Sequence, residues 1–217
     1  MIYDTILFDL DGTLLNTLDD LADSVNAVLE KEACALRTKD EIRDFIGDGV
    51  KMLMKRSLPK ESDEKEILRC LAQFREIYME NMLNQTKPYD GILDLLEKLK
   101  SMGMKIGVVS NKLDEATKEL CKLFFEGNVD AAIGDSQKRK KKPAPDNVFE
   151  ALNQLHSSQD KTLYVGDSNV DMKTAKNAGL ACVGVTWGYR SKEVLLEEGA
   201  DYIIDEPNQL IELIENL

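Results

Sequence analysis

Short apolar runs alternate with amphipathic segments of helical period from Pro88 to the C-terminus, and this alternation restricts the fold more than any other feature. The apolar runs predict strands at 104–110, 131–133, 162–165, 182–185 and 202–204. The segments between them predict helices at 92–102, from about 115, and at 146–155, 172–178, 193–198 and 208–216. Strands that alternate with helices indicate a parallel, doubly wound α/β sheet of the Rossmann-like type.

The N-terminal region adds one strand and then interrupts this pattern. The run Thr5–Phe8 predicts a buried strand of the same sheet, whereas residues 16–87 contain only helical patterns. These patterns lie at 18–29, 40–46, 50–58 and 65–82. We therefore predict an α/β core domain of residues 1–15 and 88–217, with an inserted α-helical domain of residues 16–87.

The composition excludes several classes of protein. A formal net charge of −12 disfavours binding to nucleic acid or to anionic membranes. The basic run 138–142 lacks interleaved aromatic residues, so we interpret it as a solvated loop. No apolar run is long enough to span a bilayer, and the N-terminus lacks the basic start of a signal peptide. We therefore expect a cytoplasmic protein with no nucleic-acid or membrane partner.

The four cysteines are scattered along the chain, without a paired spacing and without a neighbouring histidine. We interpret Cys34, Cys70, Cys121 and Cys182 as small buried side chains in a reducing compartment, rather than as disulfide partners or zinc ligands. The single histidine, His156, lies near the end of a predicted core helix and is expected at the surface.

Two acids directly follow the first predicted strand, in the sequence Asp9-Leu10-Asp11-Gly12-Thr13. Residues two apart in an extended segment share one side, so both carboxylates can point into one pocket. One acid could then attack a substrate while the other handles protons. An ordinary Asp-Gly turn is the alternative interpretation.

Polar residues also follow two later strands, at the sheet edge where ligands of α/β proteins bind. Ser110 and Asn111 follow the strand 104–110, and Asp167 and Asp171 follow the strand 162–165. Either group could instead cap the next helix. Two carboxylates at a strand-to-helix turn also suit a hard cation such as Mg²⁺.

Four motifs in this order resemble those of the haloacid dehalogenase (HAD) superfamily of phosphatases and phosphomutases. They are Asp-x-Asp-Gly-Thr at 9–13, Ser110 after a strand, Lys-Pro-x-Pro at 142–145, and Gly-Asp-Ser-x-x-Asp at 166–171. The motifs span most of the chain, and the helical insertion after the first strand resembles the small α-helical cap domain of that superfamily.

The resemblance implies a role for each motif residue. Asp9 would be the nucleophile that forms an aspartyl-phosphate, and Asp11 would be the general acid and base. The implied Mg²⁺ ligands are Asp9, the main-chain carbonyl of Asp11, Asp167 and Asp171. The implied phosphate-binding residues are Thr13, Ser110, Asn111 and Lys142, where the lysine directly before the proline is chosen over Lys140 and Lys141.

Departures from other branches of the superfamily narrow the expected reaction. The second acid, Asp11, disfavours dehalogenation and phosphonate cleavage. The position at which the sugar phosphomutase branch carries a histidine is Leu21 here, which favours hydrolysis. The segment Phe45–Lys51 and the later Thr186–Tyr189 resemble the phosphoglycolate phosphatase group.

The inserted domain contains the predicted determinants of substrate choice. Gly47 and Gly49 form a loop that could lie close to a small substrate, and Lys51 or Arg56 could meet a substrate carboxylate. The alternative is that the glycines simply join two helices while both cations are solvated.

We therefore expect a Mg²⁺-dependent phosphatase of a small phosphorylated metabolite, with phosphoglycolate as the first candidate. A sugar phosphomutase of the β-phosphoglucomutase type and a pyrophosphatase or nucleotidase are the alternatives. A non-catalytic binding protein is disfavoured because no motif residue is missing. The expected state is a monomer or a homodimer.

Overall fold

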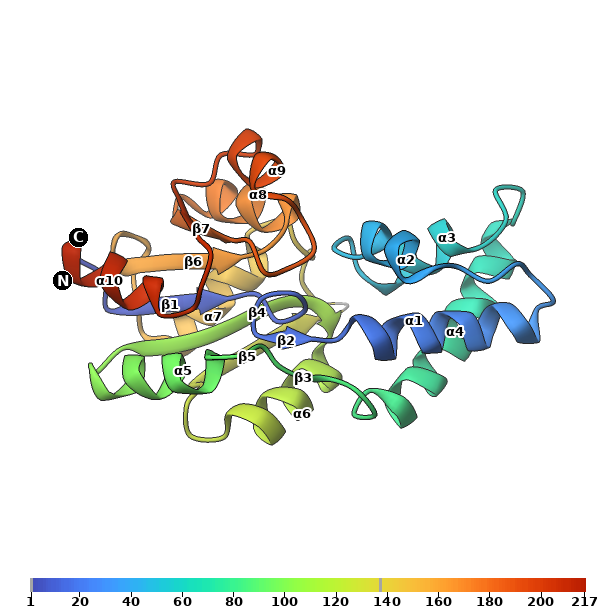
Figure 1. Cartoon of the computed structure of the whole chain (residues 1–217), viewed down its shortest axis with the longest axis horizontal. Coiled ribbons are helices and arrows are strands. Elements are labelled where there is room, and N and C mark those ends of the chain that lie inside the picture. Colours follow the sequence, from blue (N-terminus) through green and yellow to red (C-terminus); the bar gives the residue numbers. More distant parts are fainter. Residues whose placement is uncertain (1, 137) are drawn as a thin grey trace. The chain divides into compact units, whose positions relative to one another are not determined.

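The computed structural model describes residues 2–136 and 138–217. The chain forms two compact units (Figure 1), each of which is described by itself. Unit 1 contains Met1–Leu15 and Pro88–Leu217, and unit 2 contains Asn16–Lys87.

Unit 1 is built on a parallel sheet of six strands in the order β5-β4-β1-β6-β7-β8. The strands are β1 (Thr5–Phe8), β4 (Lys105–Leu113), β5 (Ala131–Asp135), β6 (Thr162–Gly166), β7 (Ala181–Val185) and β8 (Tyr202–Ile204). All residues of β1 are buried because helices cover both faces of a doubly wound sheet. The predicted doubly wound parallel fold is thereby confirmed.

The helices of unit 1 lie on both sides of this sheet. In Figure 1, α5 (Ile92–Ser101) and α6 (Asp114–Phe125) lie below it, and α8 (Asn169–Ala178) and α9 (Lys192–Glu197) lie above it. An apolar cluster from β4, β6 and β7 packs against α7 (Asp146–Leu155), α8 and α9. A 3₁₀ turn (Gln159–Lys161) precedes β6, and α10 (Gln209–Asn216) ends the chain.

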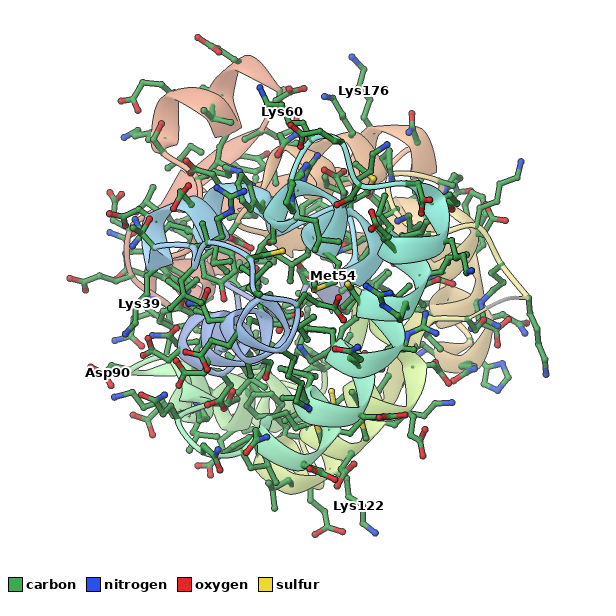
Figure 2. All side chains as sticks on the ribbon, turned by 90° about the vertical axis from the view of Figure 1, so that its right-hand side faces the viewer. Lys39, Met54, Lys60, Asp90, Lys122 and Lys176 are labelled. Carbon is green, nitrogen blue, oxygen red and sulfur yellow. The ribbon has the colours of Figure 1, made fainter. Side chains whose placement is uncertain are left out.

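Unit 2 consists of four helices, as the sequence predicts. They are α1 (Leu18–Lys31), α2 (Lys39–Phe45), α3 (Val50–Ser57) and α4 (Glu64–Asn81). Their apolar faces form the interior, where Met54 is buried, whereas Lys39 and Lys60 are exposed (Figure 2). Capping boxes satisfy the first N–H groups of α2 and α4, which explains why these helices begin where they do.

Three local features differ most from the sequence-based predictions. The two connections between the units pair as a small sheet of β2 (Leu15–Asn16) and β3 (Lys87–Pro88), which are too short to show a periodic pattern. β4 extends through Leu113, three residues beyond the predicted end. α8 begins at Asn169 rather than Met172, because the Ser168 side chain caps it.

The cysteine and histidine predictions are confirmed in all but one position. Cys70, Cys121 and Cys182 are buried and His156 is exposed. Cys34 is partly exposed, so its predicted burial is wrong: it follows the end of α1, beyond the apolar face of that helix. All four cysteines are free thiols. None of the helices in residues 2–136 and 138–217 combines the length and hydropathy that a transmembrane helix needs.

Candidate active site

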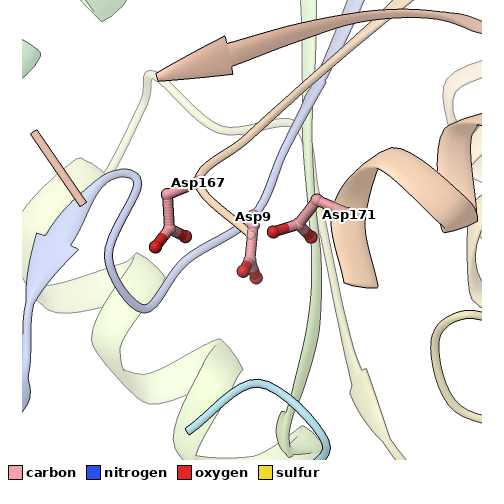
Figure 3. Close-up of side chains that lie close together, drawn as sticks. All are labelled: Asp9, Asp167 and Asp171. Atoms are coloured by element: carbon pink, nitrogen blue, oxygen red, sulfur yellow. The ribbon is translucent and has the colours of Figure 1, made fainter. Parts of the chain in front are cut away.

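Three buried carboxylates lie together at the carboxyl edge of the sheet. Asp9 follows β1, Asp167 follows β6, and Asp171 lies in the first turn of α8 (Figure 3). β1 and β6 are adjacent parallel strands, so the acids that follow them leave the sheet side by side. One oxygen from each of the three carboxylates lies within 4.8 Å of the others.

Lys142 places its ammonium group among these acids. Its Nζ lies 2.8 Å from Asp9 Oδ1 and 2.7 Å from Asp171 Oδ1, and the side chain is only 2% exposed. Tyr164, from inside β6, lies 3.3 Å from the same Nζ through its hydroxyl group. The lysine therefore bridges the strand-end acid and the helix acid.

Asn111 holds the main chain of Lys142 on both sides. Its amide nitrogen donates to the Lys142 carbonyl at 3.0 Å, and its amide oxygen accepts from the Lys142 N–H at 2.8 Å. The Asn111 side chain thus positions Lys142, and phosphate binding by Asn111 stays a prediction.

The charges of this cluster do not balance within the protein. Three carboxylates surround one ammonium group, and burial makes the excess negative charge costly. Burial and the Asp171 charge raise the pKa of Asp167 to about 7. Burial, and then the charge of Asp171, also raise the pKa of Asp9 well above its usual value.

The same cluster keeps Lys142 charged. Burial acts against the ammonium form, but the carboxylates of Asp171 and Asp9 raise the pKa of Lys142 well above its usual value. A hard divalent cation fits the donor set, because three carboxylates supply the oxygen ligands and excess charge that it requires.

The second acid of the first motif lies beside a lysine. Asp11 Oδ1 accepts a hydrogen bond from Lys112 Nζ at 2.8 Å, and the lysine side chain is 2% exposed. The Lys112 main-chain N–H donates to Ser110 Oγ at 3.2 Å, and this hydrogen bond orients the Ser110 hydroxyl group. Ser110 itself is buried.

The segment 187–189 supports the first motif and the Asp167 carboxylate. Trp187 Nε1 donates to the Thr13 carbonyl at 3.0 Å, and the Tyr189 N–H donates to Asp167 Oδ2 at 2.8 Å. The Thr13 hydroxyl group donates to Asp167 Oδ1 at 3.1 Å. The buried Thr13 side chain thus orients Asp167. This role adds to the predicted one, because the sequence indicated only phosphate binding for Thr13.

Gly188 leaves no room for a side chain, so Gly188→Ala is expected to disturb the site. An added Cβ would lie 2.3 Å from Asp167 Cβ and 2.5 Å from the Gly12 carbonyl oxygen. We expect a loss of stability of about 1–3 kcal/mol and weaker cation binding, measured by thermal unfolding with and without Mg²⁺.

Gly199→Ala is the matched control for this substitution. Gly199 has a φ of 93°, but nothing lies within 4 Å of an added Cβ. That variant should lose stability through backbone strain alone and keep the wild-type response to Mg²⁺. An unchanged response to Mg²⁺ in Gly188→Ala would contradict the proposed support of Asp167.

The predicted specificity residues lie in unit 2. Gly47 and Gly49 both have positive φ values and connect α2 to α3. Arg56 closes this connection, with a 2.5 Å contact to Asp48 Oδ2 and a 2.8 Å hydrogen bond to the Phe45 carbonyl. Lys51 forms an ion pair of 2.5 Å with Glu64. A contact of either cation with substrate stays a prediction.

Sequence reasoning missed several residues that the structure places at the site. Lys112 directly follows Ser110 and Asn111, so its position at a strand end was the available signal. Tyr164 carries a hydroxyl group among the apolar residues Leu163 and Val165 of β6. No sequence signal connects Trp187 and Gly188 to Thr13 and Asp167, because this proximity depends on the fold.

Comparison with known proteins identifies the group to which this arrangement belongs. The family model of the haloacid dehalogenase-like hydrolases matches residues 6–185. The phosphoglycolate phosphatase of Aquifex aeolicus is 35% identical over 212 residues, which cover 97% of this chain and 96% of that protein. A protein of Caldanaerobacter subterraneus named "Putative pyrophosphatase PpaX" is 32% identical over 96% of this chain and 93% of its own length.

A solved structure agrees over nearly the whole chain. The crystal structure of a "putative phosphoglycolate phosphatase" from Lactobacillus delbrueckii has a TM-score of 0.93 and 33% identity, and 99% of each chain is covered. These similarities confirm the resemblance predicted from the four motifs, and the phosphatase class with it. The chain therefore belongs to the haloacid dehalogenase-like hydrolase family.

Proposed function

We propose that this protein is a Mg²⁺-dependent phosphatase of a small phosphorylated metabolite, and that phosphoglycolate is its substrate. The observation that carries this proposal is the placement of the Lys142 ammonium group 2.8 Å from Asp9, within a cluster of three buried carboxylates. The relatives named phosphoglycolate phosphatase support the choice of substrate.

Asp9 is the proposed nucleophile. One of its carboxylate oxygens forms a bond to phosphorus while the bond from phosphorus to the ester oxygen breaks, so that the alcohol leaves and an aspartyl-phosphate remains. Its other contacts hold it for this attack, because the Leu10 N–H donates to Asp9 Oδ1 at 2.7 Å. Lys142 and Ser110 would bind the phosphoryl oxygens.

Asp11 is the proposed general acid and then the general base. It would donate a proton to the departing ester oxygen, and the resulting carboxylate would accept a proton from the water that hydrolyses the aspartyl-phosphate. The free alcohol, inorganic phosphate and the original Asp9 carboxylate are then the products. The Asp11 side chain is 14% exposed, so it can exchange protons with solvent.

Asp9, Asp167, Asp171 and the Asp11 carbonyl are the proposed ligands of Mg²⁺. When bound, Mg²⁺ offsets the repulsion between the attacking carboxylate and the anionic phosphoryl group. Asp171 is firmly placed for this role, because Oδ2 accepts from the Ser168 N–H at 3.0 Å and the Ser168 hydroxyl group at 2.6 Å.

Mg²⁺ binding should strengthen as pH rises from 6 to 8, because Asp167 must lose its proton to bind the cation. Burial and Asp171 raise the pKa of Asp167 to about 7, so its deprotonation costs stability in the metal-free protein as pH rises toward 7. Mg²⁺ binds the deprotonated form and must displace a proton at pH 6. We expect Mg²⁺ to raise the unfolding temperature more at pH 8 than at pH 6.

Thermal unfolding with and without Mg²⁺, or after removal of cations by EDTA, measures this difference. Asp167→Asn is the test variant, and the exposed Asp94→Asn is its control. Asp167→Asn should lose the Mg²⁺ response at both pH values, while Asp94→Asn should retain it. An equal Mg²⁺ response at pH 6 and pH 8 would show that Asp167 does not titrate on binding.

A phosphate-release assay over a substrate panel tests the proposed function. We expect kcat/KM for phosphoglycolate to exceed that for pyrophosphate, nucleoside monophosphates and sugar phosphates by at least about tenfold. A higher kcat/KM for pyrophosphate would favour the alternative that the Caldanaerobacter relative suggests. Conversion of β-glucose 1-phosphate into its isomer without phosphate release would instead indicate a phosphomutase.

Unit 2 is proposed to act as the cap that selects the substrate, as in the family resemblance. The loop at Gly47–Gly49, together with Lys51 and Arg56, would carry that selection. The oligomeric state, monomer or homodimer, and the cytoplasmic location stay predictions.

A further inference from the structure

Lys112 is a buried cation that the phosphoryl-transfer chemistry above does not use. Its side chain is 2% exposed, and its Nζ lies 2.8 Å from Asp11 Oδ1. Lys142 already places an ammonium group at Asp9, where the phosphoryl group would bind. Unit 1 thus holds two buried lysines, one beside the proposed nucleophile and one beside the proposed general acid.

We propose that Lys112 forms a binding subsite for a carboxylate on the leaving group of the substrate. This inference rests on the proposed function, because it takes Asp11 as the residue that meets the leaving-group oxygen. According to this inference, a residue of unit 1 makes the protein prefer a phosphorylated hydroxy acid to a phosphate ester whose leaving group is uncharged.

The geometry around Asp11 places Lys112 within reach of such a carboxylate. A general acid approaches the departing oxygen to hydrogen-bond distance, about 3 Å. Lys112 Nζ lies 2.8 Å from the same carboxylate. It is therefore about 6 Å from that oxygen if Oδ1 also faces the leaving group, and at most about 8 Å if Oδ2 does. The carboxylate of a phosphorylated α-hydroxy acid is attached two bonds from the ester oxygen, on the side away from phosphorus, so it can bridge this gap.

The ammonium group is also preorganised for an anion. The Lys112 main chain is held by the hydrogen bond from its N–H to Ser110 Oγ, and its side chain is enclosed. Little side-chain freedom remains to be lost when an anion binds. A buried ammonium group interacts more strongly with a carboxylate than an exposed one, because water screens the pair less.

The cations of unit 2 also pair with carboxylates, as Lys112 does with Asp11, but these pairs are more exposed to solvent. Arg56 contacts Asp48, and Lys51 contacts Glu64, at 2.5 Å in each case. These side chains are about one-third to two-thirds exposed, with 34% for Arg56 and 46% for Lys51. Each would exchange a well-solvated partner for the substrate, which gives little net gain. Lys112 is the better-placed determinant of charge preference.

The experiment compares two substrates that differ only in the charged group. Phosphoglycolate carries a carboxylate where ethyl phosphate carries a methyl group. We expect Lys112→Met to lower kcat/KM for phosphoglycolate by about 10- to 100-fold more than kcat/KM for ethyl phosphate, the usual range for a lost charge-assisted hydrogen bond, because loss of the contact with Asp11 affects both substrates alike. Lys112→Arg should retain most of the preference for phosphoglycolate.

Binding without turnover provides a second readout. In the Asp9→Asn background, isothermal titration should show tighter binding of phosphoglycolate than of ethyl phosphate, and Lys112→Met should remove that difference. Lys118→Met is the matched control, because Lys118 pairs with Asp114 at 2.6 Å on the exposed face of α6. Lys118→Met should leave the binding affinity and kcat/KM for both substrates unchanged. Lys112→Gln replaces Lys112→Met if the latter does not fold.

Equal losses for phosphoglycolate and ethyl phosphate would overturn the inference, because Lys112 would then act only by positioning Asp11. The same conclusion follows if Lys112→Arg behaves like Lys112→Met. If the wild-type protein hydrolyses other esters but not phosphoglycolate, the proposed substrate is wrong. Phospholactate and isopropyl phosphate then form the test pair, and loss of the preference for phospholactate in Lys112→Met would still support the subsite.

Discussion

Asp9→Asn is expected to reduce the kcat for phosphate release by at least about 10³-fold, the largest effect of any single substitution. The amide lacks the negative charge with which Asp9 would attack phosphorus. Folding should be retained, because Asn has nearly the same shape and Lys142 still pairs with Asp171 at 2.7 Å. Burial and the charge of Asp171 already raise the pKa of Asp9, so a neutral side chain relieves repulsion there.

Initial-rate measurements of phosphate release, with thermal unfolding of the same preparations, check this prediction. We expect the unfolding temperature of the Mg²⁺-free variant to equal or exceed that of the wild type. Asp94→Asn, at an exposed position in the first turn of α5, should have wild-type activity and stability. Wild-type turnover by Asp9→Asn would exclude Asp9 as the nucleophile.

Lys142→Met is expected to impair both activity and folding. The ammonium group contacts two buried carboxylates, and its removal leaves Asp9 and Asp171 facing each other without a cation. Breaking a buried ion pair in this way costs about 3–5 kcal/mol of stability. We also expect kcat/KM to fall by at least about 10²-fold, because the phosphoryl oxygens lose a charged donor.

Denaturant unfolding and steady-state kinetics of Lys142→Met measure the two effects. Lys140→Met is the control, because Lys140 lies in the same basic run but is exposed. That variant should keep stability within about 0.5 kcal/mol of the wild type. If Lys140→Met lost as much activity as Lys142→Met, the selection of Lys142 from the basic run would be wrong. Addition of Mg²⁺ should restore part of the stability of Lys142→Met, since it supplies the missing positive charge.

Most of the fold could be predicted because its pattern is local. The apolar run Thr5–Phe8 and the alternation after Pro88 follow from periodicities that any short window reveals, and β1, α7 and β8 have the predicted bounds. The pairing of β2 with β3 could not be predicted, since two-residue strands have no period. The start of α8 at Asn169 depends on the Ser168 side chain, which overrides the apolar pattern.

The composition of the site was accessible for a different reason. Asp9 and Asp167 each follow a strand and Ser110 lies near the carboxyl end of β4, and parallel strands place such positions at one edge of the sheet. The partners of these residues were not accessible. Asn111 was expected to bind phosphate, but its side chain spans the Lys142 main chain, and Thr13 orients Asp167. These contacts join residues that are 31 and 154 positions apart.

The amino-acid sequence by itself determined the reaction class of this protein, because the residue types that attack, donate protons and bind a cation are written in four short motifs. Only the tertiary structure decided which charges meet. The Lys142 ammonium group lies between Asp9 and Asp171, and the Lys112 ammonium group contacts Asp11. The second of these lysines is the proposed binding site for a substrate carboxylate. Electrostatic interaction depends on distance and burial, and both arise only when distant parts of the chain pack together.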